Sequence, residues 1–327
     1  MNQTKIILLI LVIFGIGVFW YLEKNTGNTD PGIRTSGDSS TKEFAFQGKG
    51  LRTNTAKASI SLDKVLDGGP GKDGIPALTN PKFVDIKTAE TSVKDTMDGL
   101  VISVGNSTKF YPYSIMVWHE IVNDVVGDTP LVITFCPLCG SAIVFDTDDQ
   151  FGVSGKLYES NLLMYDKKTE SLWSQSIGTA VVGDRTGEKL TVYPSQVLSF
   201  KTFKERWPSG QVLSTDTGYG RNYNLYPYGD YDTNDAIFFP VSVNDNRLPP
   251  KEVMYVVNAY DRSIAFQANK LGTTPVSVDV DGQKVTAALV RGEIVVKDSS
   301  GKVLPGYHEM WFSWAVHHQE DGIVWKK

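Results

Sequence analysis

Short apolar runs separated by Gly, Pro, Asn and Asp fill most of this chain, and they predict a β-rich fold. The runs are rich in Val, Ile, Tyr and Phe, which favours strands over helices. Leu100–Val104 and Thr108–Tyr111 flank Gly105-Asn106 and predict a hairpin, while Leu131–Phe135 and Ala142–Phe145 predict two strands around a turn. Further strands are predicted at Val153–Tyr158, Leu162–Tyr165, Ala180–Val182, Leu190–Tyr193, Ile237–Val243, Met254–Val257, Val276–Val280, Val285–Leu289 and Glu293–Lys297.

Three other segments have helical patterns. Apolar residues of Tyr113–Val126 recur at helical spacing, so we expect a helix that ends at Gly127. Short helices are also predicted at Ala58–Leu66 and at Phe200–Trp207, the latter with Ser199 as its N-cap. The predicted fold class is therefore α+β and β-rich, with many short, mostly antiparallel strands and a few short helices.

The N-terminus predicts one transmembrane helix. Ile6–Leu22 carries no charged residue and reaches about 25 Å as a helix, which is the short end of a bilayer span. A cleaved signal peptide is the alternative, but no small-residue cleavage site follows this stretch. Lys5 and the terminal amine favour a cytoplasmic N-terminus. Residues 1–22 would then be a stub and single-pass anchor in the lipid bilayer of the cell membrane, with the rest of the chain outside.

The remainder divides into a linker and a domain. Residues 23–57 are predicted to be a flexible polar linker, because Gly, Ser, Thr and Asn dominate them and aliphatic residues are few. Residues 58–327 are predicted to form the extracytoplasmic β-rich domain. Gly127–Leu131 and Gly272–Val276 resemble each other, so two related halves remain an open alternative.

Composition and charge narrow the possible partners. Of 327 residues, 41% are hydrophobic and 21% charged, which excludes a disordered chain and a multi-spanning membrane protein. A formal net charge of −5 gives no basic field, so we expect no nucleic-acid partner. A protein or small-molecule partner is not indicated by the composition.

The most informative stretch is Cys136-Pro-Leu-Cys139, which holds both cysteines of the chain. A Cys-x-x-Cys-Gly turn between two strands brings both thiolates to one point, as in a metal-binding knuckle. The same spacing serves dithiol redox chemistry, but a thioredoxin-like site needs a helix after the first cysteine, and here a strand is predicted. A structural disulfide in an oxidising compartment is the third alternative.

A metal ion at this turn needs further ligands. His119 is the first candidate, because it lies at the edge of the predicted helical stripe before the cysteines. A core histidine bonded to a backbone carbonyl is the competing interpretation. Met164 is the second candidate, although a strand methionine is commonly a core residue. Two thiolates with a thioether and an imidazole suit a copper ion better than a zinc ion, because soft ligands select Cu(I).

Several ordered motifs resemble the prokaryotic family known as domain of unknown function 3179. The likeness covers roughly residues 74–320. Its motifs are Tyr111-Pro112, His119–Asp124, Cys136–Ala142, Phe151–Tyr158, Asn161–Asp166, Thr169–Gln175, Tyr226–Tyr231 and Arg247–Pro249. The resemblance implies a fold unit with a marked cysteine–histidine region and implies no activity.

Three functions therefore compete. The first is a membrane-anchored metal-binding protein that uses Cys136, Cys139, His119 and Met164, with copper favoured over zinc. The second is a thiol–disulfide oxidoreductase, and the third is a non-catalytic envelope binding module with a structural disulfide. Tyr226, Tyr228 and Tyr231 either line a cleft or cap the β core.

Overall fold

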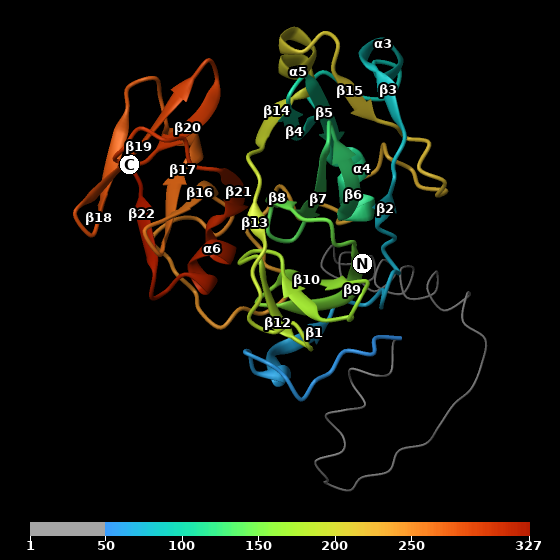
Figure 1. Ribbon diagram of the computed structural model, residues 1–327, viewed down its shortest axis with the longest axis vertical. Helices are drawn as coiled ribbons and strands as arrows, with labels where there is room; N and C mark the ends of the chain where they lie inside the picture. The colour runs from blue at the N-terminus through green and yellow to red at the C-terminus, as the bar shows by residue number, and fades with distance from the viewer. Residues whose placement is uncertain (1–49) are drawn as a thin grey trace, which may run out of the picture. The chain divides into compact units, whose positions relative to one another are not determined.

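Four β-sheets form the framework of residues 50–327, which are the residues that the computed structural model describes (Figure 1). Most strand pairs are antiparallel and the few helices are short, which confirms a β-rich α+β fold for this part of the chain. The predicted anchor Ile6–Leu22 and residues 23–49 of the predicted linker lie outside it. Within residues 50–327, no helix is long and apolar enough to cross a bilayer.

The largest sheet carries the cysteine turn. Its strands follow the order β2-β6-β7-β8-β21-β16-β17-β22, and β13 pairs with β8 beside this path. In Figure 1, β21 joins the green strand β8 to the orange and red strands β16, β17 and β22. The bounds are β2 Leu78–Thr79, β6 Ile121–Val126, β7 Thr129–Cys136, β8 Ser141–Asp146, β13 Thr191–Val192, β16 Val253–Ala259, β17 Arg262–Gln267, β21 Gly306–Met310 and β22 Gly322–Trp325.

Three smaller sheets complete the fold, with the orders β1-β9-β10-β11-β12, β14-β4-β5-β15-β3 and β18-β19-β20. Their strands are β1 Val65–Asp67, β3 Phe83–Asp85, β4 Asp98–Val104, β5 Ser107–Pro112, β9 Phe151–Tyr158, β10 Asn161–Asp166, β11 Leu172–Ser174, β12 Thr179–Val182, β14 Gln196–Ser199, β15 Gln211–Leu213, β18 Val276–Val280, β19 Gln283–Val290 and β20 Glu293–Lys297. The helices are η1 Leu62–Lys64, α3 Ile86–Ala89, α4 Tyr113–His119, α5 Phe200–Arg206, η2 Ala268–Lys270 and α6 Trp311–His317.

Most of the predicted elements are present. The hairpin around Gly105-Asn106 is β4–β5, and the strands that flank the cysteine turn are β7 and β8. The predicted helix after Ser199 is α5, and the Ser199 hydroxyl accepts the Thr202 N–H as expected of an N-cap. The other predicted strands overlap β9, β10, β12, β13, β16, β18, β19 and β20, with one exception given below.

The helix predicted over Tyr113–Val126 is wrong in its second half. Helix α4 ends at His119, and Glu120 takes a left-handed φ of 58°. Residues Ile121–Val126 form strand β6, which pairs with β7 through a turn at Gly127. Four of these six residues are β-branched and fit a pleated surface better than a helix. Val125, which the helical pattern placed on the apolar face, is half exposed.

Two further predictions are corrected. The segment Ala58–Leu66 contains only the 3-10 turn η1 before strand β1, because Val65–Asp67 pairs with β9. The predicted strand Ile237–Val243 lies in residues 214–252, which contain neither helix nor strand. At the described end of the predicted linker, Leu51 is buried, and the Arg52 N–H donates to Glu170.

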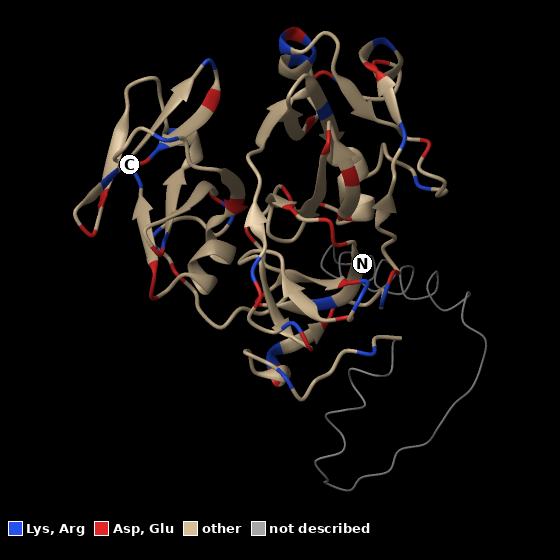
Figure 2. Cartoon of the chain, viewed as in Figure 1, with Lys and Arg blue, Asp and Glu red and all other residues tan. Residues whose placement is uncertain are grey.

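The largest hydrophobic cluster surrounds the cysteine turn. It contains both cysteines together with Met164 of β10, Trp173 of β11 and Tyr231 of the irregular segment. Figure 2 shows Lys and Arg interspersed with Asp and Glu over the described elements, while the strands around the turn are largely uncharged. The two thiols therefore lie where the sheets meet in an apolar core rather than on a charged surface.

Candidate functional site

The two cysteines form the tight end of the β7–β8 hairpin. Cys136 is the last residue of β7 and pairs with Ser141 of β8, and the Cys139 N–H donates to the Cys136 carbonyl at 3.1 Å. Gly140 then takes a φ of +54°, where a Cβ would lie 3.0 Å from the side chain of Met310. Glycine therefore closes the turn for both backbone and packing reasons.

Both thiols are free and buried. Cys136 is 2% exposed and Cys139 is not exposed, and no disulfide joins them. The Cys139 Sγ–H donates to the Ser160 carbonyl at 3.2 Å. Burial is the main cause that raises the pKa of Cys139 well above its ordinary value, and the adjacent Cys136 sulfur adds to the effect. The Cys139 thiol therefore stays protonated unless a metal ion binds the sulfur or an oxidant reacts with it.

A short polar chain reaches Cys139 from helix α6. Ser313 opposes part of the rise in the Cys139 pKa, because its hydroxyl can donate to the sulfur once the thiol is deprotonated. In the structure the single Ser313 proton is donated to Glu309 Oε1 at 2.7 Å, and Ser176 donates to the same oxygen at 2.5 Å. Burial raises the pKa of Glu309. The Glu309 carboxyl thus lies one hydroxyl away from the Cys139 sulfur.

The irregular segment 214–252 covers the other side of the turn. The Tyr231 hydroxyl donates to the Leu138 carbonyl at 2.6 Å, between the two cysteines in sequence. The ammonium of Lys251 lies 3.3 Å from the centre of the Tyr231 ring and donates to the Tyr231 carbonyl. A loop of this length without regular structure is uncommon in a compact domain and is typical of a functional cover. Of the two interpretations of the tyrosine-rich segment, the cap over the core applies to Tyr231.

A buried carboxyl lies behind this cover. Glu120 is 6% exposed and accepts a hydrogen bond from the Tyr228 hydroxyl at 3.0 Å. Burial raises the pKa of Glu120 to about 7, although the Tyr228 bond opposes this shift. The backbone of Glu120 also ends α4 and accepts the Phe135 N–H of β7. Glu120 therefore links the helix, the cysteine hairpin and the cover.

His119 is buried, and both of its ring nitrogens are engaged. Its Nδ1 lies 2.8 Å from the Pro76 carbonyl and its Nε2 lies 2.8 Å from the Tyr223 hydroxyl. Burial lowers the pKa of His119, so the neutral ring predominates at pH 7. The Nδ1–H then donates to Pro76 and Nε2 accepts from Tyr223. The interpretation as a core histidine bonded to a carbonyl has direct support, and His119 would have to give up its Tyr223 bond to ligate a metal.

Met164 lies in β10 and is fully buried in the cluster that contains both cysteines. A second methionine, Met310, packs against Gly140, and its N–H donates to the Cys139 carbonyl at 2.8 Å. Sequence reasoning missed Met310, Ser313 and Glu309, because β21 and α6 were not predicted and lie far along the chain. In residues 50–327, no group of three or more His, Cys, Asp and Glu side chains is arranged to hold a metal ion.

Comparison with known families gives one match. A family model described as "Protein of unknown function (DUF3179)" matches residues 72–303, which agrees with the resemblance inferred from the motifs. Neither the curated proteins nor the solved structures contain a match to this chain. The matched region includes the cysteine hairpin, α4 and the whole of the irregular segment.

Proposed function

This chain belongs to the DUF3179 family of proteins of unknown function, and we propose that it binds one Cu(I) ion between the thiolates of Cys136 and Cys139. The observation that carries the proposal is a pair of free thiols at one hairpin end in an apolar core. Cu(I) is a soft ion with a filled d shell, and it accepts two thiolates as a sufficient ligand set. A closed zinc site needs four ligands.

The surroundings of the turn support copper over zinc. The described residues offer no group of three or more zinc-type ligands, whereas a thioether, that of Met310, packs on Gly140. Thioethers are soft ligands that favour Cu(I). Met164 lies in the same core and is the thioether that the sequence predicts. A bound ion would also compensate for the burial that raises the pKa of Cys139, because metal binding displaces the thiol proton.

Copper binding by the full chain, purified in an uncharged detergent, tests this proposal. Under anaerobic, reducing conditions we expect one Cu(I) per chain in competition with a chromophoric copper chelator. C136S and C139S should each lose stoichiometric copper, because a single thiolate does not hold the ion against the chelator. M164L and H119Q show whether the Met164 and His119 side chains contribute to copper affinity. Thermal unfolding identifies the variants that remain folded.

Three results would overturn the copper assignment, the last of them by reassigning the metal. One is a wild-type chain that binds no Cu(I) although its thiols are reduced. Another is a folded C136S or C139S chain that retains one equivalent. Zinc bound with four ligands, seen by X-ray absorption at the metal edge, would reassign the site to zinc.

Thiol–disulfide exchange is the second candidate function, and the Ser313–Glu309 chain beside Cys139 favours it. In this reaction Cys136 and Cys139 form a disulfide while a disulfide of a partner protein is reduced to two thiols. The two thiol protons pass to the partner's sulfurs, and Glu309 is placed to carry one of them. Titration with glutathione mixtures measures a reversible potential in this case. A disulfide that reductants reach only after unfolding would instead indicate a structural bond in a non-catalytic envelope module.

We further propose that Ile6–Leu22 anchors the protein in the cell membrane with its domain outside. The uncharged apolar stretch and the single Lys5 before it support this orientation. Protease added to intact cells should then remove the domain, whereas the same protease should spare a cytoplasmic control protein. The purified chain should still begin at Met1 or beside it. A mature N-terminus after Leu22 would contradict the anchor and indicate a cleaved signal peptide.

A further inference from the structure

We propose that the cavity beside the cysteine turn binds a small organic cation, an ammonium group carried on an apolar body. The cavity has a volume of about 490 Å³. It lies between α4, the β7–β8 turn, β21 and the irregular segment, and Pro137 and Gly140 of the turn form part of its wall. Volumes of a few hundred Å³ with a largely apolar lining are typical of small-molecule sites. The proposal does not depend on copper binding.

Aromatic rings from three different elements line this cavity. Tyr113 comes from α4, Phe135 from β7, and Tyr223 and Tyr226 from the irregular segment. Tyr113 and Phe135 stack at a centroid distance of 4.2 Å with an interplanar angle of 19°. The faces of such rings carry negative potential and attract cations, and cages of several rings are used to bind quaternary ammonium ligands.

The charged groups at the cavity have one sign. Asp98 and Asp232 line it, and its wall contains no Lys or Arg. Each carboxylate acts on one of the lining rings, since the charge of Asp98 raises the pKa of Tyr113 and that of Asp232 raises the pKa of Tyr226, in both cases after burial as the main cause. The other titratable lining residues are Tyr223, whose pKa burial raises, and His308, whose pKa burial lowers to about 4, so both side chains are neutral at pH 7. Burial also raises the pKa of Asp98.

Arg221 and Lys251 act on lining residues of the cavity, but neither forms part of its wall. Arg221 lies near Tyr223, but its guanidinium stacks over the Trp118 ring at 5.5 Å. Lys251 lies over Tyr231 and experiences the charges of Asp230, Asp232 and Asp235 together. The charged side chains of the wall itself are therefore carboxylates. An anion in the cavity would face the lining carboxylates, whereas a cation would interact favourably with these carboxylates and with the ring faces.

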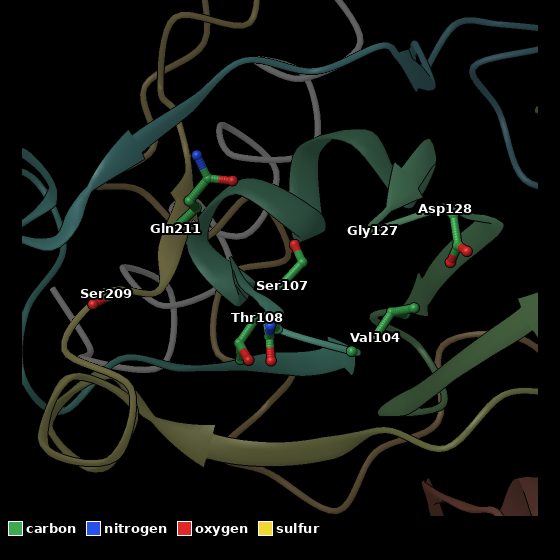
Figure 3. Close-up of a pocket in the computed structure, with 9 residues that line it drawn as sticks. Val104, Ser107, Thr108, Gly127, Asp128, Ser209 and Gln211 are labelled. Carbon is green, nitrogen blue, oxygen red and sulfur yellow. The ribbon is translucent and has the colours of Figure 1, made fainter.

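A second cavity of similar size provides an internal comparison. It has a volume of about 540 Å³ and lies at the β4–β5 and β6–β7 turns (Figure 3). Asp128 lines it, together with Ser107, Thr108 and Gln211, and its wall has no aromatic ring. A hollow with one carboxylate and no aromatic ring provides no cation–π contact. We therefore expect the cation to bind in the aromatic cavity beside the cysteine turn and not in this one.

Isothermal titration calorimetry on the full chain in an uncharged detergent tests the assignment. The probes are benzyltrimethylammonium, the neutral benzyl alcohol and the anionic phenylacetate. We expect saturable binding of the ammonium probe at one site and much weaker binding of the other two. Y226L should lower the affinity for the ammonium probe by about 2- to 30-fold, which is the range that one cation–π contact contributes. Y226F keeps the ring and should bind as the wild type does.

Neutral variants of the lining carboxylates test the contribution of their charge to binding. D98N with D232N should weaken the ammonium probe and leave benzyl alcohol unchanged, while D128N, in the cavity of Figure 3, should leave both unchanged. Equal affinity of folded Y226L and Y226F would overturn the proposal, as would phenylacetate that binds as tightly as the ammonium probe. Loss of ammonium binding in D128N would show that the probe binds in the other cavity, and this result would also overturn the proposal.

Discussion

Replacing Gln175 by alanine should destabilise the domain by about 3–5 kcal/mol, because several buried polar groups would lose their partners at once. Gln175 is fully buried, and both ends of its amide are paired. Its Nε2 donates to Thr134 Oγ1 at 2.9 Å and to the Ser141 carbonyl at 3.2 Å. Its Oε1 accepts from Ser141 Oγ at 2.6 Å and from Asn161 Nδ2 at 3.0 Å.

These bonds hold the cysteine hairpin in place. Thr134 and Ser141 belong to β7 and β8, whereas Asn161 belongs to β10 of another sheet. The Gln175 amide therefore joins two sheets beside the thiols. Chemical denaturation measures the loss of stability, and Q319A, at an exposed glutamine, is the control that should change it by less than about 0.5 kcal/mol. If Q175A is as stable as Q319A, the amide does not join the sheets in solution.

The second large effect concerns Glu120 and pH. The pKa of this buried carboxyl is about 7 in the folded chain, against an ordinary value of 4.5. A group whose folded pKa is raised stabilises the fold fully at low pH, and this contribution is lost as the pH rises through the folded value. As the pH rises from 4.5 to 8, ionisation of Glu120 should therefore lower the free energy of unfolding by about 3 kcal/mol, from about 1.4 kcal/mol per pKa unit.

E120Q removes this titration and keeps an acceptor for the Tyr228 hydroxyl. The variant and the wild type should have similar stability near pH 4.5, and the variant should be more stable by about 3 kcal/mol at pH 8. His308 and His317, whose pKa values burial lowers to about 4, titrate equally in both chains and cancel in the difference. Unfolding curves at several pH values measure this difference in stability between E120Q and the wild type. A constant difference across this range would mean that Glu120 ionises at its ordinary pKa.

Local features of the site could be predicted from the sequence because their residues are neighbours in the chain. The cysteine hairpin needs only two β-rich runs and a Cys-Pro-Leu-Cys-Gly turn between them, and β7 and β8 form it. The hairpin β4–β5 and the N-cap Ser199 follow from equally short patterns. The DUF3179 resemblance is likewise a property of ordered local motifs.

The boundary at Glu120 could not be predicted in this way. Apolar residues at helical spacing continue through Ile121–Val126, but the same residues are β-branched, so the pattern fits both a helix and a strand. Pairing with β7 decided in favour of the strand, since Ile121 meets Thr134 and Val126 meets Thr129 across the hairpin. The turn at Glu120 then gives its side chain the buried position from which its raised pKa follows.

By itself, the sequence determined the β-rich class, the family and the turn that places two thiols together. The tertiary structure decided what surrounds those thiols. Ser313 and Glu309 reach Cys139 from α6 and β21, and Tyr231 reaches Leu138 from a segment 93 residues away. Contacts between residues so far apart depend on the order in which the strands join the sheets. No local propensity encodes that order, because each strand can satisfy its backbone hydrogen bonds with many partners, and the packing of the whole core selects one arrangement.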